Sequence, residues 1–434
     1  MPRPTDTYTE PSRELPVIAE ADVLVIGGGP GGIGAAVAAA RNGAKTILVE
    51  RFGSFGGTWT AGLLSAIMPF PFVKGIFQEV VDQWTKAGGW NPWGDNYGGG
   101  GTYDSEAAKV VLDRLVIKAG VTPYFFAHAV AVIREGARIS GVIIESKEGR
   151  QVIRAKVVID SSGDGDISAL AGVPVEIGRA EDGAVQPMTM IFKMSGVDDA
   201  AAEAYRKTDY NLTNAWQAAK TRGEITVPRE DVLVGRNPRA GEWNFNTTRI
   251  VHKDGTKLRD VTDAMIEGRR QVFEVASFMR RHIPGFEQAV VAETPPHIGV
   301  RETRRVRCDY TMSATDILDV PPAADCIARG NWFIDIHSPT GEGTERRHPP
   351  EGRWYEIPYR SLCAQGIDNL LVASRCIDTT HEAHAAVRIT PQVMAIGQGA
   401  GTAAALAVRQ GHHTTRGVDA TQLRETLRRQ GAFV

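Results

Sequence analysis

The side chains that can carry chemistry fall into two groups, histidines and arginines. His337 and His384 suit acid–base work, because an imidazole titrates near neutral pH. Arg301 and Arg388 suit the binding of an anion, because a planar guanidinium holds a carboxylate through two parallel hydrogen bonds. These four residues are our catalytic candidates. The alternative for each histidine is a structural role, and for the arginine run 301–305 it is a salt-bridged surface.

The sequence gives no sign of a metal centre. His381 and His384 are three residues apart, but no third ligand follows at a closed spacing. Four cysteines are widely separated and form no C-x-x-C pair, which argues against zinc, an iron–sulfur cluster and a disulfide framework. We therefore predict no metal, and free thiols in a reducing cytoplasm.

A glycine-rich turn, GGGPGG, follows the apolar run 21–26. Gly27 allows the tight turn from strand to helix, and Gly29 lets the backbone approach a pyrophosphate at the helix N-terminus. Gly32 permits close packing of that helix on the strand. Glu50, which ends the next apolar run, can accept hydrogen bonds from ribose hydroxyls. The glycines alone are a weak signal, but strand, helix and acid together predict dinucleotide binding.

The elements around this turn form a βαβ unit with strands at 21–26 and 45–49 and a helix at 33–41. A second helix is predicted from its cap at Asp104 to about Ala119. The remaining predictions are strands at 121–133, 139–146, 151–159 and 369–373, amphipathic helices near 201–220 and 260–281, and a small-residue helix at 391–409.

Two later segments indicate FAD. The strand that ends in VVIDSSGDGD (157–166) resembles the second nucleotide-contacting strand of two-dinucleotide flavoproteins, although a plain turn is the alternative. Thr390 and Pro391 form a helix start, with Thr390 as the predicted N-cap. The free N–H groups of Gln392 and Val393 can then stabilise negative charge on a reduced flavin.

Six ordered blocks resemble the FAD-dependent oxidoreductase family of the glutathione-reductase-fold superfamily. They are VLVIGGGPGGIGAA (23–36), VERFGSFGGTWTAGL (49–63), VVIDSSGDGDISALAG (157–172), GVRETRRV (299–306), IPYRSLCAQGIDNLLVASRCID (357–378) and VRITPQVMAIGQGAGTAAALA (387–407). The cysteines that disulfide reductases carry after GGT are absent, because Trp59 and Leu64 stand there. No second G-x-G-x-x-G follows a strand, so no built-in NAD(P)H domain is expected.

The resemblance implies that FAD is the cofactor. It places Val130 at adenine, Gly163 near the adenosine and Arg375 on ribityl or phosphate oxygens, and it makes Arg388 the best-placed cation by analogy with flavin succinate and fumarate enzymes. The implied FAD-binding residues are Gly27, Gly29, Pro30, Gly31, Gly32, Glu50, Arg51, Gly57, Thr58, Trp59, Val130, Gly163, Asp164, Arg375, Gln392 and Val393.

The predicted fold is α/β: a Rossmann-like FAD-binding domain with a mixed or parallel sheet and an inserted α+β substrate domain. The expected division is an extension (1–20), FAD-binding segments at 21–68, 102–190 and 351–434, an inserted loop (69–101) that ends in a GGGG run, and a substrate or cap domain at 191–350.

Composition limits the partners. The net charge of −2 argues against nucleic acid, and no stretch approaches the ~20 apolar residues of a membrane span. The N-terminus lacks the apolar region of a signal peptide, so we expect a cytoplasmic protein with a small-molecule substrate. The sequence leaves homo-oligomer formation open.

Three functions fit these features. The first is an oxidoreductase that transfers hydride between FAD and a small polar or anionic organic substrate. The second is a flavin monooxygenase that free NAD(P)H reduces. The third is a flavoprotein with non-redox chemistry, which the near-neutral charge disfavours for an RNA substrate.

Overall fold

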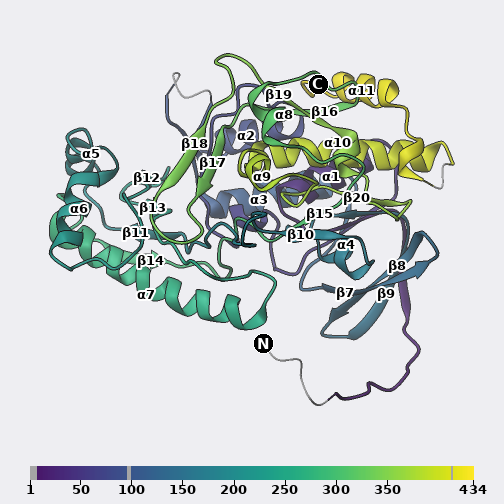
Figure 1. Cartoon of the computed structure of the whole chain (residues 1–434), viewed down its shortest axis with the longest axis horizontal. Helices are drawn as coiled ribbons and strands as arrows, with labels where there is room; N and C mark the ends of the chain where they lie inside the picture. Colours follow the sequence, from purple (N-terminus) through teal and green to yellow (C-terminus); the bar gives the residue numbers. More distant parts are fainter. Residues whose placement is uncertain (1–6, 95–98, 412–413) are drawn as a thin grey trace.

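The protein, for which we analyse a computed structural model, is described over residues 7–94, 99–411 and 414–434. Two units share the chain (Figure 1). The sheet unit, residues 17–177 and 304–434, contains the first strand and the last helix of the described chain. The inserted unit, residues 188–293, lies to one side of it and carries α5 (Asp199–Arg206), α6 (Thr213–Thr221) and α7 (Leu258–His282).

The βαβ unit is present as predicted, with small changes in its limits. Strand β1 (Val17–Ile26) leads into α1 (Pro30–Arg41) and then β2 (Thr46–Val49), and β1 and β2 pair in parallel. The expected extension 1–20 is too long, because Val17 already pairs with Val152 at the start of β1.

The main sheet has seven strands within the described residues, in the order β6-β2-β1-β9-β8-β7, with β20 on the other part of β9. Strand β9 (Gly149–Asp160) pairs antiparallel with β8 at its start and parallel with β20 at its end. The carboxyl ends of the parallel strands therefore meet at one edge of the sheet. The other strands are β6 (Thr122–Tyr124), β7 (His128–Glu135), β8 (Arg138–Ser146) and β20 (Leu370–Val372).

Helix α10 (Thr390–Arg409) packs directly on α1 because glycines remove side chains from the interface. A Cβ on Gly397 would lie 2.0 Å from the carbonyl oxygen of Gly31, and one on Gly401 would lie 2.0 Å from that of Ala35. The small-residue pattern thus joins the last long helix to the first. Helix α3 (Ser105–Lys118) begins at the predicted cap, where the Asp104 carboxylate accepts the N–H groups of Glu106 and Ala107.

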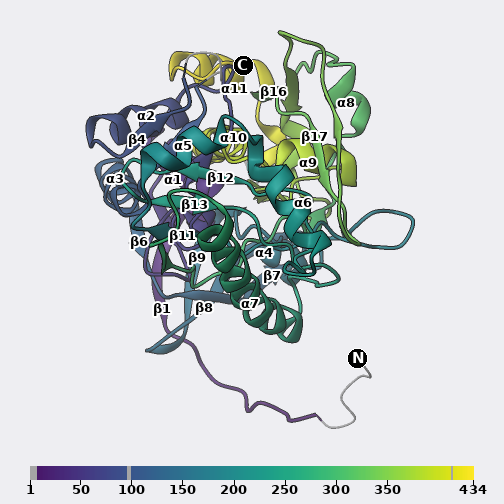
Figure 2. The same ribbon diagram turned by 90° about the vertical axis from the view of Figure 1, so that its left-hand side faces the viewer.

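The inserted unit has an antiparallel sheet, β12 (Val234–Arg236), β13 (Trp243–Phe245), β11 (Phe192–Ser195) and β14 (Val290–Glu293), with α7 (Leu258–His282) beside it (Figure 2). The predicted helix near 201–220 is two helices, α5 (Asp199–Arg206) and α6 (Thr213–Thr221). The inserted unit has a separate hydrophobic core, whose residues lie between Met190 and Ala289 in the sequence. Val306 and Ile334 belong to the core of the sheet unit. The inserted unit therefore ends earlier than the expected limit at residue 350.

The segment 69–101 is not a loop, which corrects the prediction. It contains α2 (Ile76–Lys86), whose apolar face buries Phe77, Val80 and Trp84, and β4 (Trp90–Pro92), which pairs with β5 (Gly101–Tyr103). The flanking Gly, Pro and Asn residues hide this helical spacing. Residues 95–98, including the first glycine of the GGGG run, lie outside the described residues.

All four cysteines are buried free thiols. In the described parts of the chain, no helix has the length and apolar character to cross a membrane.

Candidate FAD and substrate site

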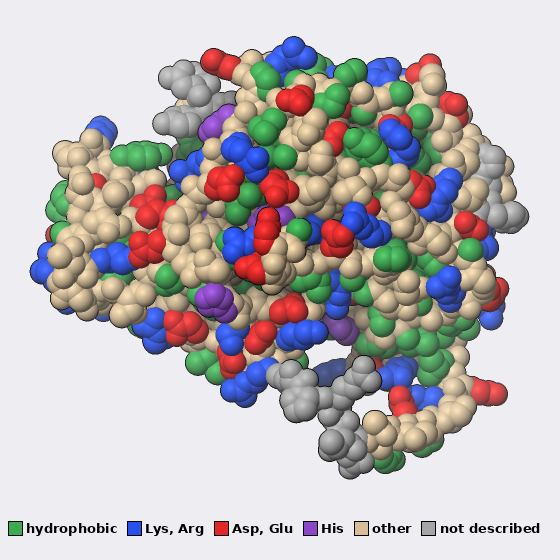
Figure 3. All heavy atoms as spheres, in the orientation of Figure 1, with side chains coloured by type: hydrophobic (Ala, Val, Ile, Leu, Met, Phe, Trp, Pro, Cys, Tyr) green, Lys and Arg blue, Asp and Glu red, His purple; other side chains and the backbone are tan. Residues whose placement is uncertain are grey.

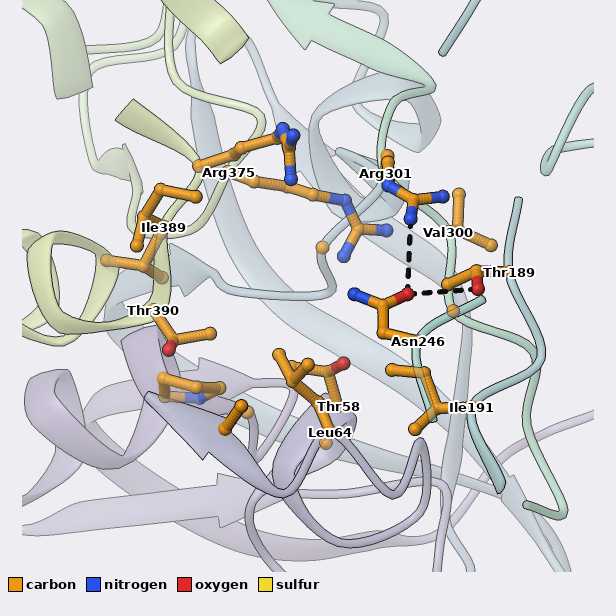
Figure 4. A pocket seen from close by; sticks show the side chains of 18 of the residues that line it. Thr58, Leu64, Thr189, Ile191, Asn246, Val300, Arg301, Arg375, Ile389 and Thr390 are labelled. Atoms are coloured by element: carbon orange, nitrogen blue, oxygen red, sulfur yellow. Dashed lines mark hydrogen bonds between the residues drawn. The ribbon is translucent and has the colours of Figure 1, made fainter. Parts of the chain in front are cut away.

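A cavity of about 1040 Å³ lies at the carboxyl ends of β1, β2 and β9 and extends toward the inserted unit (Figure 4). Ligands of open α/β sheets bind at this edge. The glycine turn before α1 lines one end of the cavity, and residues of the inserted unit, among them Thr189, Ile191 and Asn246, line the other. We call the first the nucleotide end and the second the substrate end.

At the nucleotide end, Gly27, Gly29, Pro30 and Gly31 line the cavity. A Cβ on Gly29 would meet no heavy atom within 4 Å, so the backbone there is open toward the cavity. Gly32 does not line the cavity; a Cβ on it would lie 1.7 Å from the carbonyl oxygen of Gly27. Gly32 thus has the packing role that its place in the motif predicts, without facing the cavity.

Glu50 lines the cavity, and its position is set by backbone hydrogen bonds. Its Oε2 accepts the N–H of Gly28 at 2.6 Å, and its Oε1 accepts the N–H of Phe52 at 2.8 Å. Burial raises the pKa of Glu50 despite these hydrogen bonds. Each carboxylate oxygen keeps a further lone pair for ribose hydroxyls.

A second polar group forms where β9 ends. Gly163, Asp164 and Arg375 line the cavity, and Arg375 Nη2 donates to Asp164 Oδ1 at 2.6 Å. Thr303 donates to the same oxygen at 2.6 Å. Burial opposes ionisation of Asp164, but Arg375 and Thr303 outweigh it and lower the pKa. Arg51, also a lining residue, lies 3.3 Å from His297 Nε2.

Gly57, Thr58 and Val393 also line the cavity, as does Thr390 at the start of α10. Figure 4 shows Thr58 and Thr390 on the cavity wall. Thr390 is the first helical residue and Ile389 the N-cap, so the predicted cap is wrong by one residue. The N–H of Val393 is not free, because it donates to the Ile389 carbonyl oxygen at 3.0 Å.

Besides Gly32, three predicted cofactor residues lie outside the cavity lining. Trp59 is fully buried and packs edge-on against Trp84, with ring centroids 5.2 Å apart. Val130 sits at a break in the β7–β8 register, and Ala129 lines the cavity in its place. Gln392 is fully buried in α10. Packing buries the side chains of Trp59 and Gln392, whereas the contact of Val130 with adenine stays a prediction.

Arg301 lines the substrate end (Figure 4). Its Nη1 donates to the Pro187 carbonyl oxygen at 2.6 Å and its Nη2 to Asn246 Oδ1 at 3.3 Å. Among the described residues, no carboxylate lies within 4.0 Å of its guanidinium. Burial, with further cations nearby, lowers the pKa of Arg301 well below its usual value. Arg301 is thus a buried cation with neutral partners.

Arg388 and His337, both predicted as catalytic candidates, also line the substrate end. Arg388 Nη2 donates to the Asp335 carbonyl oxygen at 3.2 Å and lies 3.9 Å from Asp335 Oδ2. The same oxygen, Asp335 Oδ2, lies 3.6 Å from His337 Nε2, a distance longer than that of a hydrogen bond. Burial and Arg301 lower the pKa of His337 well below its usual value.

His384 does not reach the cavity, which corrects its assignment as a catalytic candidate. It lies on the buried side of α9 (His381–Val387), and its Nε2–H donates to the Arg301 carbonyl oxygen at 3.0 Å. Burial lowers its pKa to about 4. His381 contacts Glu302 through Nδ1 at 2.8 Å and is likewise outside the lining. Both histidines support the chain around Arg301.

Sequence reasoning missed Asp335, Asn246, His297 and Arg249. Asp335 stands two residues before His337 on β17 (Ile334–His337), and this spacing puts both on one face of a strand. His297 lies two residues before the block 299–306. No local pattern marks Asn246 or Arg249.

The residues of the cavity fit FAD. The open backbone at Gly29 and the carboxylate of Glu50 suit the pyrophosphate and ribose, and Arg375 Nε and Arg388 Nε are buried polar atoms without a hydrogen-bond partner among the described residues. Such donors suit an oxygen-rich ligand. Fold and site together define a flavoprotein with FAD as its cofactor.

The chain belongs to the FAD dependent oxidoreductase family, whose model matches residues 22–427. It is 35% identical over 156 residues to the thiamine thiazole synthase of Methanococcus vannielii, covering 34% of this chain and 57% of the relative. It is 30% identical over 154 residues to the digeranylgeranylglycerophospholipid reductase of Thermoplasma acidophilum, covering 33% of this chain and 39% of that enzyme. The matches thus span less than two thirds of either relative.

A solved structure of a geranylgeranyl bacteriochlorophyll reductase-like protein from Thermoplasma acidophilum superposes with a TM-score of 0.52. It is 14% identical and covers 95% of this chain and 84% of its own. This likeness shows the Rossmann-like α/β fold. Family and fold together establish an FAD-dependent enzyme of the oxidoreductase class.

Proposed function

We propose that the protein transfers hydride between FAD and a small anionic organic substrate whose carboxylate binds Arg301. The observation that carries this proposal is the state of Arg301, a buried cation at the cavity wall with only neutral hydrogen-bond partners in the described chain. A buried charge is costly unless an opposite charge compensates it. An anionic ligand supplies that charge and gains a forked pair of donors.

The neighbouring residues support an anion at this place. Arg388 adds a second cation beside the start of α10, and Asp335 contacts Arg388 at the long distance of 3.9 Å. Asn246 holds Arg301 through Oδ1, and the same oxygen accepts the Thr189 hydroxyl at 3.1 Å (Figure 4). This network fixes the direction of the guanidinium before a ligand arrives, which reduces the cost of ordering on binding.

The position of these cations relates to the cofactor. When bound, FAD supplies the two-electron redox chemistry, and the protein supplies binding and orientation. Arg388 precedes Ile389 and Thr390, which line the middle of the cavity, so an anion on the arginines lies close to that region. The apolar side chains of Leu64 and Ile191 restrict water there.

A small molecule is the proposed partner. On the face drawn in Figure 3, acidic and basic side chains are interspersed and no broad basic surface appears. Such mixing favours a small-molecule ligand over nucleic acid.

Anaerobic reduction tests the proposal. The purified holoprotein is mixed with small hydroxy and saturated carboxylic acids, with their primary amides as uncharged controls, and with NADH and NADPH. We expect an acid to bleach the flavin absorbance, or the matching oxidised acid to restore it after chemical reduction, and the amides to fail. Rapid bleaching by NAD(P)H followed by oxygen-dependent product would instead establish the monooxygenase alternative.

A further inference from the structure

Arg249 lies behind His337 as seen from the cavity. His337 lines the cavity, whereas Arg249 is outside the lining and is fully buried in the inserted unit, just before α7. Arg249 Nη2 is 3.2 Å from His337 Nδ1. The two ring nitrogens of an imidazole point in diverging directions, so Nε2 of His337 faces away from Arg249.

The chemistry of this contact allows one arrangement of protons. A guanidinium has only donors, so a hydrogen bond between Arg249 and His337 Nδ1 requires that Nδ1 accept. Nδ1 then carries no proton, and in the neutral ring the proton is on Nε2. An imidazolium, with a proton on both nitrogens, would point an N–H at the N–H of Arg249.

Arg249 is itself held in place. Its Nη1 donates to the carbonyl oxygens of Gly341 and Gly343 at 3.0 and 3.1 Å and lies 3.2 Å from Glu230 Oε2. Glu230 in turn accepts the Thr344 hydroxyl at 2.8 Å. Burial lowers the pKa of Arg249 to about 10, which leaves it protonated at neutral pH. The guanidinium therefore cannot turn away or become an acceptor.

The three arginines around His337 act in the same direction. Arg301, Arg388 and Arg249 disfavour a further positive charge, while Asp335 favours it. Asp335 Oδ2 lies 3.6 Å from His337 Nε2, so the carboxylate is a long and weak acceptor for the Nε2–H. The Nε2–H is thus a donor with one weak partner, on the wall of the cavity that holds Arg301.

We infer that Arg249 is a positioning residue that holds His337 as the neutral Nε2–H tautomer, so that His337 donates a hydrogen bond to the substrate and accepts no proton from it. This inference rests on the proposed function for the presence of a substrate at Arg301. It narrows the substrate to an acid with a second, uncharged acceptor oxygen, such as a 2-oxo acid. It also replaces the general-base role that the sequence predicts for His337.

The tautomer can be measured without turnover. Protein labelled with ¹⁵N in histidine is recorded by NMR at several values between about pH 5 and pH 8, with His337→Gln to assign the signal. We expect a pyridine-type signal for Nδ1 and a pyrrole-type signal for Nε2, unchanged across this range. A pyrrole-type Nδ1, or an imidazolium signal near neutral pH, would overturn the inference.

Substitution of Arg249 then tests its part. In Arg249→Met we expect the two tautomers to mix, and in Arg249→Lys, which restores one donor, we expect the Nε2–H form to return. If Arg249→Met does not fold, the Lys variant and the wild-type spectrum still decide. An Nε2–H signal that persists unchanged in folded Arg249→Met would show that another group fixes the ring.

Ligand binding separates this inference from the proposed function. The oxidised holoprotein is titrated with 2-oxobutyrate and with butyrate, followed by the flavin absorbance. We expect 2-oxobutyrate to bind more tightly by roughly fivefold, the gain of one hydrogen bond, and this preference to fall toward one in His337→Phe. Equal binding of both acids contradicts the donor role of His337 but keeps the anion site. Binding of neither acid contradicts the proposed function, whereas the NMR result still decides the tautomer.

Discussion

The two ends of the cavity differ in whether their buried charges have partners of opposite charge within the protein. At the nucleotide end, two carboxylates are compensated by arginines within the protein: Asp164 pairs with Arg375 at 2.6 Å, and Asp166 pairs with Arg304 at 2.7 Å. At the substrate end, Arg301 has neutral partners only within the described chain, and Arg388 is 3.9 Å from its nearest carboxylate.

This difference shows which end depends on a ligand for its charge balance. The nucleotide end is shaped by backbone atoms, and the carboxylate of Asp164 there already has an arginine partner. The substrate end keeps buried positive charge, which favours an anion by electrostatics. The following changes test each side of this comparison.

The largest effect is expected from Gly32→Ala, at the nucleotide end. Its Cβ would lie 1.7 Å from the Gly27 carbonyl oxygen, so α1 would have to move away from β1. We expect a loss of about 3 kcal/mol or more in unfolding free energy, measured by chemical denaturation. The matched control is Gly29→Ala, where a Cβ meets nothing within 4 Å. It should fold normally and lose FAD affinity alone; equal destabilisation of both variants would contradict this account.

Glu50→Gln should weaken FAD binding without unfolding the protein. An amide keeps one acceptor for the N–H groups of Gly28 and Phe52 but directs its own N–H at the other. The expected cost is about 1.5 to 3 kcal/mol, or roughly 10- to 100-fold in the dissociation constant of FAD. Fluorescence titration of the apoprotein measures it. An unchanged affinity would remove Glu50 from the ribose site.

The smallest effect concerns the support behind Arg301. His384 has a folded-state pKa of about 4 against an ordinary value of 6.5. Between these values the unfolded chain binds a proton that the folded chain does not, so stability falls as the pH falls. His384→Gln, which can still donate to the Arg301 carbonyl oxygen, should reduce this pH dependence by about 1.4 kcal/mol per pH unit. Denaturation between about pH 6 and pH 4.5 measures the slope. An unaltered slope would mean that His384 titrates normally.

The sequence predicts the nucleotide end well because its signals are local. Turn, helix start and acid occur within one βαβ unit, where each residue type follows from backbone geometry. Two residues predicted there lie outside the cavity lining because of packing: the core takes up the ring of Trp59, and Val130 lies at a register shift between β7 and β8.

The substrate end is less predictable because four separate segments build it. Arg301, His337 and Arg388 were found by residue type, yet Asn246 and Arg249 come from the inserted unit and carry no motif. His384 shares the residue type of His337 but faces the core, since α9 presents that side to Arg301. The helix α2 was hidden for a similar reason, because flanking turn residues masked its apolar spacing.

The most direct test of the account is the charge requirement at Arg301. The oxidised holoprotein is titrated with a small carboxylate and with its primary amide in the wild type, Arg301→Lys and Arg301→Met, followed by flavin absorbance. Loss of a buried charge partner costs about 2 to 5 kcal/mol, so Arg301→Met should bind the carboxylate at least about 30-fold more weakly. Arg301→Lys should recover part of the loss, and amide binding should not change. Carboxylate binding of wild-type strength in folded, FAD-loaded Arg301→Met would contradict the account.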